Sequence, residues 1–541
     1  MELKRIVVDH LVIGAGTSGC VVAGGLARSG DRSVLVLEAG GDDSSIRTRV
    51  PAGTKWMYGR PRYDWQHKSQ PDASLTGRAE PWAAGRVVGG SSTINGTIYV
   101  RGSSADFDAW RDAGNLGWGH ADLLPLFREL ECTGIGADAH RGRAGPLSVE
   151  WTRSRHPLAQ ASADAMRAAG LPWTDDMNGA DFEGAGWAQV TQRNGLRMNA
   201  ARAFLHPVLR EGPHPVRLLT GAQCVGLTVR GGRCTGARFL QHGQLTEVRA
   251  QLGVVLCAGA IKSPQLLMLS GIGPGTALTA LGITVHADLP GVGQSLMEHP
   301  GVKLSAHVHG STYNVETGPV DGLGHLWRYL KHRDGPIASP HAQLLAHVRS
   351  SPNVSSPDVQ IAFYPYAFER WEGGVRRARS PAVMFTVLAS QGSGRGEVAL
   401  ASSDPLMPPL IRHRLLANDA DRQALVAGCQ LVVHIASQAP LAPKIRGWMG
   451  IDPARATEAD WQRYLDTEAS LSYHAAGSCR MGKLSGPGSD SVVDASLKVH
   501  GIAGLRVADC AVMPSPVSGN TQAAAFVIGA KAVELILTEA D

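Results

Sequence analysis

The sequence predicts an α/β protein, α+β overall, in which a Rossmann-like domain is joined to a second domain built on an antiparallel sheet flanked by helices. Three observations predict this fold. A glycine motif follows a short apolar strand near the N-terminus, further glycine-rich segments recur downstream, and alternating apolar patterns typical of strands lie between them. At about 150 residues per domain, a chain of 541 residues has room for two large domains or three to four smaller ones.

The composition and charge exclude several classes of protein. Hydrophobic residues make up 43% and charged residues 18% of the sequence, so the chain can bury a large core and is not a disordered segment. The net charge is only +5 and the basic residues are scattered, which argues against nucleic-acid binding. No apolar run approaches the ~18 residues that identify a transmembrane helix. We expect a soluble, cytoplasmic protein, with loose attachment to a membrane surface left open.

The cysteines and histidines form no metal-binding pattern. The 8 cysteines are scattered, none belongs to a C-x-x-C pair, and this spacing suits a reducing compartment. His307 and His309 lie on one face of a predicted strand, but no third ligand lies nearby in the sequence. We therefore expect no metal centre.

The first chemical motif is G-x-G-x-x-G at Gly14, Gly16 and Gly19, which follows the apolar segment 10–13. Gly14 suits a tight turn, Gly16 lets the backbone approach a pyrophosphate, and Gly19 allows close packing of a helix on the strand. A helical pattern continues to Arg28, and its N-terminus offers free N–H groups to phosphates.

An acidic residue completes this motif. A second apolar strand covers residues 33–37 and ends at Glu38, which lies 19 residues after Gly19. A carboxylate in this place can accept hydrogen bonds from ribose hydroxyls and disfavours NADP. The alternative is a glycine-rich turn followed by a surface glutamate. It does not explain why the strand, the glycines, the helix, the second strand and the acid all occur at the spacing of the motif. The motif alone does not decide between FAD and NAD.

Two longer segments carry a family resemblance. Residues 85–102 form a second glycine–serine loop, and residues 259–273 follow an apolar strand at 253–257. Both are similar to the two signatures of the glucose–methanol–choline (GMC) oxidoreductase family, and the resemblance runs from about residue 8 to 537. It implies FAD as cofactor and alcohol oxidation as the usual reaction, with choline dehydrogenase-like members most similar. Shorter matches lie at Asp64-Trp65, 201–205, 291–293 and 395–405.

The resemblance also implies which residues contact FAD. They are Gly14, Gly16, Thr17, Ser18, Gly19, Glu38, Ala39, Arg86, Gly89, Gly90, Ser91, Asn95, Gly96, Thr97, Ile98, Val225, Ala258, Gly259, Ala508, Asp509, Asn520 and Thr521. Some family members hold FAD covalently through a histidine in the first signature. Here that position is Ile94, which has no nucleophile, so we expect non-covalent FAD.

The C-terminal region resembles the part of the family that carries the reaction. The segment 473–482 is similar to the catalytic histidine loop, which makes His474 the active-site base, with a hydride passing to flavin N5. A histidine, with an unperturbed pKa of about 6.5, suits proton acceptance at neutral pH. Asn520 stands where relatives carry a second histidine or an asparagine. Its amide can hydrogen-bond the substrate oxygen but cannot take a proton. An ordinary helix N-cap, before a predicted helix at 521–537, is the alternative interpretation.

One stretch departs from the family pattern. Where relatives have Asn-Leu-Gln-Asp-His, this chain has Ser295-Leu-Met-Glu298-His299, which weakens any expectation about local hydrogen bonds.

The expected substrate is a small alcohol, in the first place a primary alcohol oxidised to an aldehyde, with electrons passed to an acceptor other than NAD, either a quinone or O2. Choline itself is doubtful, because a quaternary ammonium needs an aromatic cage and often a carboxylate. Tyr364, Tyr366 and Tyr473 are candidates for the substrate pocket, with core packing as the alternative.

An O2-using alcohol oxidase and a hydroxynitrile lyase-like flavoprotein remain alternative functions. The chain is a monomer or a dimer.

These placements predict a discontinuous organisation. Residues 1–155, 221–300 and 476–541 form the FAD-binding domain, and 156–220 with 301–475 form the substrate-binding domain. Alternating patterns at 302–309, 358–364 and 382–389 predict strands of the antiparallel sheet.

Overall fold

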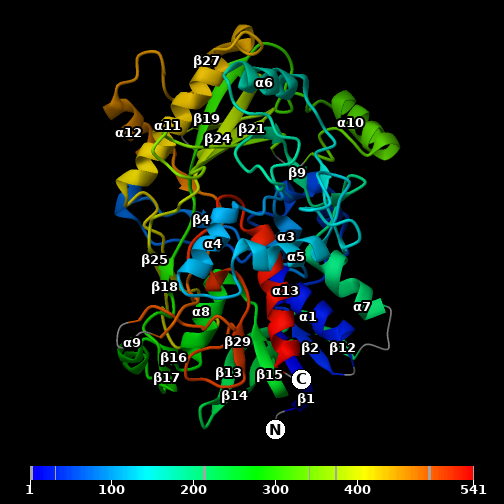
Figure 1. Ribbon diagram of the computed structural model, residues 1–541, viewed down its shortest axis with the longest axis vertical. Coiled ribbons are helices and arrows are strands. Elements are labelled where there is room, and N and C mark those ends of the chain that lie inside the picture. The colour runs from blue at the N-terminus through cyan, green and yellow to red at the C-terminus, as the bar shows by residue number, and fades with distance from the viewer. Residues whose placement is uncertain are drawn as a thin grey trace.

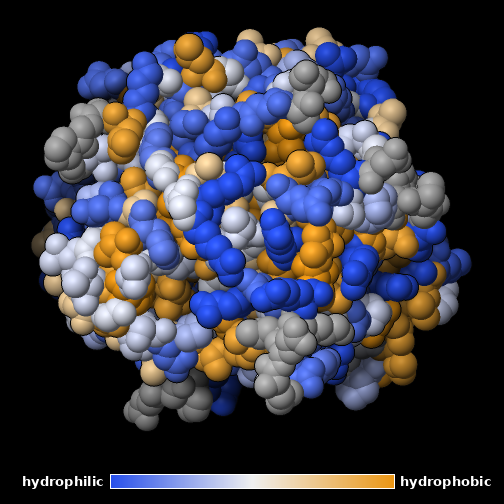
Figure 2. Space-filling model, turned by 90° about the horizontal axis from the view of Figure 1, so that it is seen from below, coloured by the Kyte–Doolittle hydropathy of each residue, from blue (hydrophilic) through white to orange (hydrophobic). Residues whose placement is uncertain are grey.

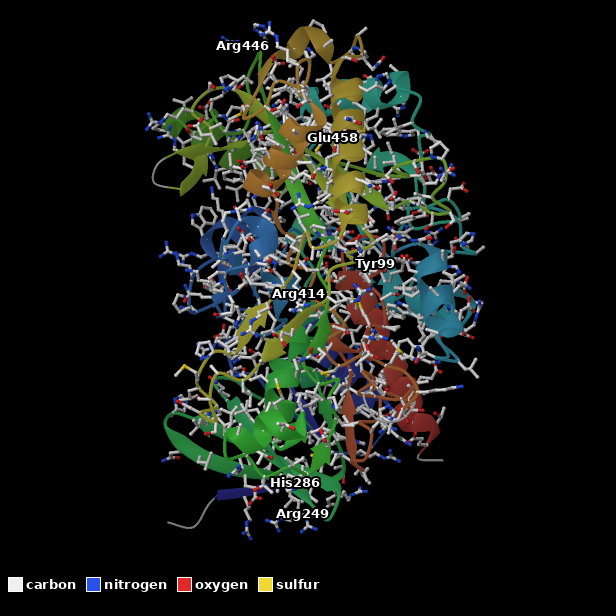
Figure 3. The ribbon with its side chains drawn as sticks, turned by 90° about the vertical axis from the view of Figure 1, so that its left-hand side faces the viewer. Tyr99, Arg249, His286, Arg414, Arg446 and Glu458 are labelled. Carbon is white, nitrogen blue, oxygen red and sulfur yellow. The ribbon has the colours of Figure 1, made fainter. Side chains whose placement is uncertain are left out.

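The computed structural model describes residues 4–30, 32–210, 215–339, 342–371, 374–484 and 489–539 (Figure 1). Two sheets occupy its two ends. Figure 3 marks the ends with side chains, where Arg446 and Glu458 lie at one end and His286 and Arg249 at the other.

The first sheet has the strand order β12-β2-β1-β15-β14-β13, with β29 beside β15. Its strands are β1 (Lys4–Ile13), β2 (Val34–Leu37), β12 (Val216–Leu219), β13 (Gln223–Arg230), β14 (Arg233–Gln241), β15 (Gln244–Leu256) and β29 (Leu505–Val507). The strands β12, β2, β1, β15 and β29 pair in parallel, and β13, β14 and β15 form an antiparallel meander. Helix α1 (Thr17–Arg28) connects β1 to β2, which is the Rossmann arrangement that the sequence predicts.

The two ends of the chain meet on this sheet. Helix α13 (Gln522–Thr538) lies against α1, as the red and blue ribbons in Figure 1 show. The approach is close, because a Cβ atom added at Gly529 would lie 2.8 Å from the carbonyl oxygen of Ser18. The predicted helix at 521–537 is thereby confirmed within one residue at each end. Its N-terminus is held beside the first glycine motif, although more than 500 residues separate the two in the sequence.

The second sheet is antiparallel, with the order β27-β19-β24-β21-β20-β8 and β28 beside β19. Its strands are β8 (Gly184–Trp187), β19 (Pro300–Val308), β20 (Leu344–Val348), β21 (Val359–Tyr364), β24 (Ala382–Ala389), β27 (Ile445–Trp448) and β28 (Ser470–Leu471). Helices α6 (Pro157–Ala168), α11 (Asp419–Ala436) and α12 (Glu458–Glu468) cover it and share its apolar core. The three strands predicted in this region are confirmed as β19, β21 and β24.

The fold class is thus confirmed, but one predicted boundary is wrong. Strand β12 pairs with β2 in the first sheet, whereas the sequence assigned residues 156–220 to the other domain. The apolar segment Val216–Leu219 completes the parallel sheet. The remaining domain limits stay predictions.

The other α-helices surround these sheets. They are α2 (Ile46–Arg49), α3 (Ser91–Ile94), α4 (Ser104–Asp112), α5 (His120–Leu130), α7 (His206–Arg210), α8 (Gly259–Leu269), α9 (Gly275–Ala280) and α10 (Pro319–His332). Hydrophilic and hydrophobic residues are interleaved on the face seen in Figure 2. Within the described ranges, no helix has the length and apolar character needed to cross a membrane.

Candidate active site

A cavity of about 590 Å³ lies where the two sheets approach each other. Its walls come from the first glycine motif, the loop before and within α3, strands β19 and β24, and the segments before α13 and after α12. A smaller cavity of about 80 Å³ adjoins it and is lined by Glu38 and by residues 222–224. The two share wall residues at Gly16, Trp65, Gly85, Gly90, Cys257, Ala258 and Lys262, so together they form one elongated space.

Most residues predicted to contact FAD lie on this space. The lining includes Gly14, Gly16, Thr17, Ser18, Glu38, Ala39, Gly90, Ser91, Asn95, Gly96, Ile98, Ala258, Gly259, Asp509, Asn520 and Thr521. Six others lie behind the walls, namely Gly19, Arg86, Gly89, Thr97, Val225 and Ala508. Their contact with a cofactor stays a prediction.

The two glycine loops press against each other at one end of the space. Gly14 has a φ of +100°, and a Cβ atom there would lie 2.5 Å from the carbonyl oxygen of Cys257. Gly90 has a φ of +55°, and its Cβ atom would lie 2.7 Å from the Cα atom of Gly16. Side chains at these positions would push the loops apart and close the path that a dinucleotide would follow.

Glu38 lies at the inner end of the smaller cavity. One carboxylate oxygen accepts a hydrogen bond from the Ala15 backbone N–H at 3.0 Å, and the other accepts one from the Gly40 N–H at 2.7 Å. Burial raises the pKa of this carboxyl group, and the two backbone donors act in the opposite direction. Each carboxylate oxygen keeps a further lone pair, and Glu38 lines the cavity, which suits the predicted role of accepting ribose hydroxyls.

A cationic neck joins the two cavities. The indole of Trp65 lies between Lys262, whose Nζ is 4.5 Å from the ring centroid, and Arg86, whose guanidinium carbon is 4.9 Å away. Burial, with the charge of Arg86, lowers the pKa of Lys262 to about 8. Its Nζ donates to the Gln265 side chain at 2.7 Å, and no ion pair joins either cation to a carboxylate in the described part of the chain.

These observations test whether the site fits FAD. Among the described residues, the half-buried cations Lys262 and Arg86 have no carboxylate ion-pair partner; Lys262 lines both cavities, and Arg86 contacts the same Trp65 ring from outside the lining. A pyrophosphate is the chemical group that such a neck would neutralise. The glycine loops and Glu38 on one side complete a site that fits a flavin dinucleotide.

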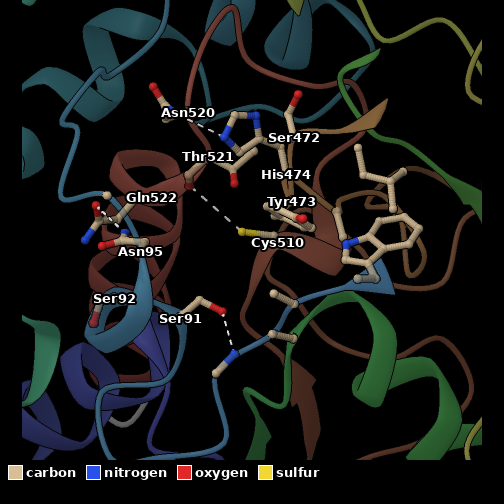
Figure 4. Close-up of a pocket in the computed structure, with 18 of the residues that line it drawn as sticks. Ser91, Ser92, Asn95, Ser472, Tyr473, His474, Cys510, Asn520, Thr521 and Gln522 are labelled. Carbon is tan, nitrogen blue, oxygen red and sulfur yellow. Dashed lines mark hydrogen bonds between the residues drawn. The ribbon is translucent and has the colours of Figure 1, made fainter. Parts of the chain in front are cut away.

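The candidate catalytic side chains meet at the other end (Figure 4). His474 is buried, and its Nε2 lies 3.0 Å from the amide nitrogen of Asn520. Its Nδ1 lies 2.9 Å from Nδ1 of His299, and the two rings meet edge to face. Asn520 is not a helix N-cap, because Thr521 takes that position and the Asn520 amide oxygen accepts from Gln360 at 3.3 Å.

This network assigns the proton of His474. The Asn520 amide nitrogen is a donor only, so Nε2 of His474 must present a lone pair. The ring proton is then on Nδ1, which donates to Nδ1 of His299, and the proton of His299 is on Nε2. Burial holds the pKa of His474 well below its usual value and lowers that of His299 to about 4. Both rings are therefore neutral at physiological pH, and the unprotonated Nε2 of His474, a residue that lines the cavity, accepts the hydrogen bond of the Asn520 amide.

Glu298 fixes the backbone of both histidines. Its carboxyl oxygens accept the N–H of His299 at 2.8 Å and the N–H of His474 at 2.9 Å. Burial raises the pKa of Glu298 to about 8. The sequence singled out Glu298 and His299 only as a departure from the family pattern, and did not predict that they support His474.

Asp509 and Asn95 tie the flanking loops together. The Asp509 carboxylate accepts from the Ser263 hydroxyl at 2.6 Å and from the Gly259 N–H at 2.8 Å, which anchors the start of α8. The Asn95 amide donates to the Gln522 side chain at 3.0 Å, which joins the second glycine loop to α13.

The three predicted pocket tyrosines all line the larger cavity. The rings of Tyr364 and Tyr366 lie 5.7 Å apart, and Tyr473 lies 6.0 Å from Tyr58. Tyr58 and Lys55 also line the cavity and were not predicted, because no local pattern marks them.

Comparisons with known proteins agree with this geometry. Two family models described as GMC oxidoreductase match residues 8–301 and 393–529. An oxygen-dependent choline dehydrogenase of Rhizobium johnstonii is 35% identical, with 98% of this chain and 95% of the relative covered. The human mitochondrial choline dehydrogenase is also 35% identical, with 98% and 89% covered.

Solved structures give the same result for the fold. A pyridoxine 4-oxidase from Mesorbium loti superposes with a TM-score of 0.86 at 28% identity, covering 97% of this chain and 98% of that chain. A formate oxidase of Aspergillus oryzae superposes with a TM-score of 0.89 at 24% identity, covering 100% and 99%. The latter likeness concerns the fold alone.

The cationic neck gives the first prediction. Replacing Lys262 by Met should weaken FAD binding by at least ~10-fold, because the pyrophosphate loses one charge-assisted contact. The dissociation constant can be measured by titrating apoprotein with FAD and following flavin fluorescence. Arg230→Met, in the exposed β13–β14 hairpin, is the matched control and should bind FAD like the wild type. If Lys262→Met binds FAD as tightly as the wild type does, the cationic neck is not part of the cofactor site.

Proposed function

The chain belongs to the GMC oxidoreductase family, which acts on CH–OH donors, and from this premise we propose that it oxidises a primary alcohol to the aldehyde. The observation that carries the proposal is the unprotonated Nε2 of the buried His474 beside the Asn520 amide. FAD, held without a covalent bond, supplies the hydride acceptor when bound.

His474 acts as the base in this proposal. An alcohol hydroxyl that replaces the direct hydrogen bond between the two side chains can donate its proton to Nε2 of His474 and accept a hydrogen bond from the Asn520 amide. The amide cannot take the proton, so His474 is the sole base of the pair. When His474 becomes an imidazolium, its Nδ1 proton remains hydrogen-bonded to His299, which stabilises the charged ring. Proton transfer of this kind contributes about 10²–10⁴-fold to a rate.

The electrons then pass to an acceptor other than NAD, a quinone or O2. Admission of air to the reduced enzyme distinguishes O2 from a quinone as the acceptor, since an oxidase regains its flavin colour at once.

Helix α10 supports a peripheral attachment to a membrane surface. Five of its apolar side chains are exposed: Val320, Leu323, Leu326, Trp327 and Leu330. They follow helical spacing and form one face, which we call the α10 apolar face. Only Tyr329 is buried and holds the helix to the protein through a hydrogen bond to Gly195 O. Lys331 lies over the Trp327 ring at 4.8 Å, and His332 and Arg333 follow at the C-terminal end. A basic amphipathic helix of this composition suits an anionic lipid surface.

The proposed reaction is tested by mixing the purified holoenzyme with primary alcohols in the absence of air. Aliphatic, aromatic or cationic alcohols that are substrates should bleach the visible flavin band. His474→Ala should slow the bleaching by about 10²–10⁴-fold with unchanged FAD content, because the proton acceptor is lost. His434→Ala, on the exposed side of α11, is the control. A flavin that no alcohol bleaches, in a protein that cleaves a cyanohydrin, would favour the lyase function instead.

The α10 apolar face is tested with vesicles. The wild-type protein should co-sediment with phosphatidylglycerol vesicles, less so with phosphatidylcholine vesicles, and less at high salt. The double variant Leu323→Gln/Trp327→Gln should lose about 10-fold or more of this partitioning, since two large apolar groups are removed. Leu116→Gln, at an exposed leucine outside this helix, should not. A wild-type protein that stays in solution and instead dimerises through this face would contradict the proposal.

A further inference from the structure

We infer that the alcohol accepted by this site carries an anionic group, such as a carboxylate, on an aromatic or apolar body, rather than a quaternary ammonium. The inference deepens the proposed function and rests on it, and it concerns the part of the large cavity that lies beyond His474 and Asn520. Three features of this part of the cavity support it: an aromatic collar, a pair of cations beside the collar, and a described lining without carboxylates at this end.

The aromatic collar consists of Tyr58, Tyr364, Tyr366, Phe368 and Tyr473, all of which line the cavity. Successive rings are in contact, because Tyr364 and Tyr366 lie 5.7 Å apart, Tyr366 and Phe368 5.8 Å apart, and Tyr58 and Tyr473 6.0 Å apart. Tyr58, Phe368 and Tyr473 are 36%, 41% and 43% exposed, which marks this end as the mouth. His474, at 9%, is at the closed end. The collar gives a flat, largely apolar passage that suits an aromatic or apolar body.

Two cations stand beside the collar, Lys55 in the cavity wall and Arg377 outside the lining. Lys55, on the 3₁₀ turn Pro51–Trp56, lines the cavity with its Nζ 4.3 Å from the ring centroid of Trp56. Arg377 belongs to the hairpin of β22 (Phe368–Trp371) and β23 (Gly374–Arg377), where it pairs with Phe368 of the collar. The two charges lie close enough that Arg377, after burial, lowers the pKa of Lys55. Neither forms an ion pair with a carboxylate of the described residues. A bound anion would relieve this repulsion.

The described carboxylates near the collar lie outside the cavity lining. Asp509 is the one carboxylate in the described lining, and it lies at the cofactor end, where it is held by Ser263 and Gly259. Behind the collar, Asp64 accepts the backbone N–H groups of Gly59, Gln66 and Ala84, Glu80 is paired with Arg78, and Glu298 holds the two histidines.

A quaternary ammonium would find aromatic faces but no carboxylate in the described lining at this end of the cavity, and it would meet Lys55 and Arg377 beside the collar. An anionic tail would meet two cations there, while its hydroxymethyl end reaches His474.

The preference can be measured without any reaction, using ligands that have no hydroxyl group. The holoenzyme is titrated with 4-methylbenzoate, 4-methylbenzamide and 4-methylphenyltrimethylammonium, and binding is followed by calorimetry and by the shift of the flavin band. We expect the benzoate to bind about tenfold more tightly than the amide, and the ammonium to bind most weakly. In Lys55→Gln the ratio between benzoate and amide should fall to about two- or threefold, and added salt should reduce it in the wild type. Arg230→Gln is the control for a distant exposed cation and should keep the wild-type ratio.

Tighter binding of the ammonium, or a Lys55→Gln variant with an unchanged ratio, would overturn the inference. The same variants, mixed without air with 4-(hydroxymethyl)benzoate and with benzyl alcohol, separate this outcome from failure of the proposed function. A charge preference in binding without bleaching by any alcohol would refute alcohol oxidation and leave the anion site. Bleaching by alcohols with a preference for the cation would refute the anion site and leave alcohol oxidation.

Discussion

The active site depends on one buried contact, the 2.9 Å approach of Nδ1 of His299 to Nδ1 of His474. Two imidazole nitrogens can lie this close only when one carries a proton and the other a lone pair, because two lone pairs or two protons would repel each other. Together with Asn520 on the opposite side of the ring, this contact leaves one arrangement of protons. Burial keeps both rings neutral, and Glu298 holds their backbones. The proposed base therefore holds this protonation state before any substrate binds.

The rest of the fold brings these groups to the cofactor space. Glu298 and His299 directly precede β19, and His474 follows β28, which pairs with the start of β19. Asn520 directly precedes α13, which is packed against α1 and the first glycine motif. The proposed base thus lies beside the second sheet, and the proposed cofactor site lies on the first sheet. The cationic neck around Trp65 lies in the wall that the two cavities share. If one sheet moved relative to the other, His474 would move away from the proposed cofactor site, to which the hydride of the substrate would pass.

Local patterns were sufficient for part of this description. The strand, glycines, helix and acid of residues 10–38 lie close in sequence, so their spacing alone predicts the Rossmann unit, and His474 was found through the resemblance of its loop. His299 was missed as its partner because the two are 175 residues apart and the contact exists only in the folded chain. Lys55 and Tyr58 belong to an irregular turn without periodicity. The boundary at residue 220 was misplaced because a four-residue apolar strand such as β12 carries no signal for the sheet it joins.

The most direct measurement is the protonation state of His474 in the FAD-loaded enzyme, by nitrogen NMR of protein labelled with ¹⁵N-histidine. Its signals can be assigned by their loss in His474→Gln. The account predicts a proton on Nδ1, a lone pair on Nε2, and no titration between about pH 5 and pH 8, where an unperturbed histidine changes charge. A proton on Nε2, or a titration near the ordinary histidine pKa, would contradict the claim that the fold presents a neutral, correctly oriented base.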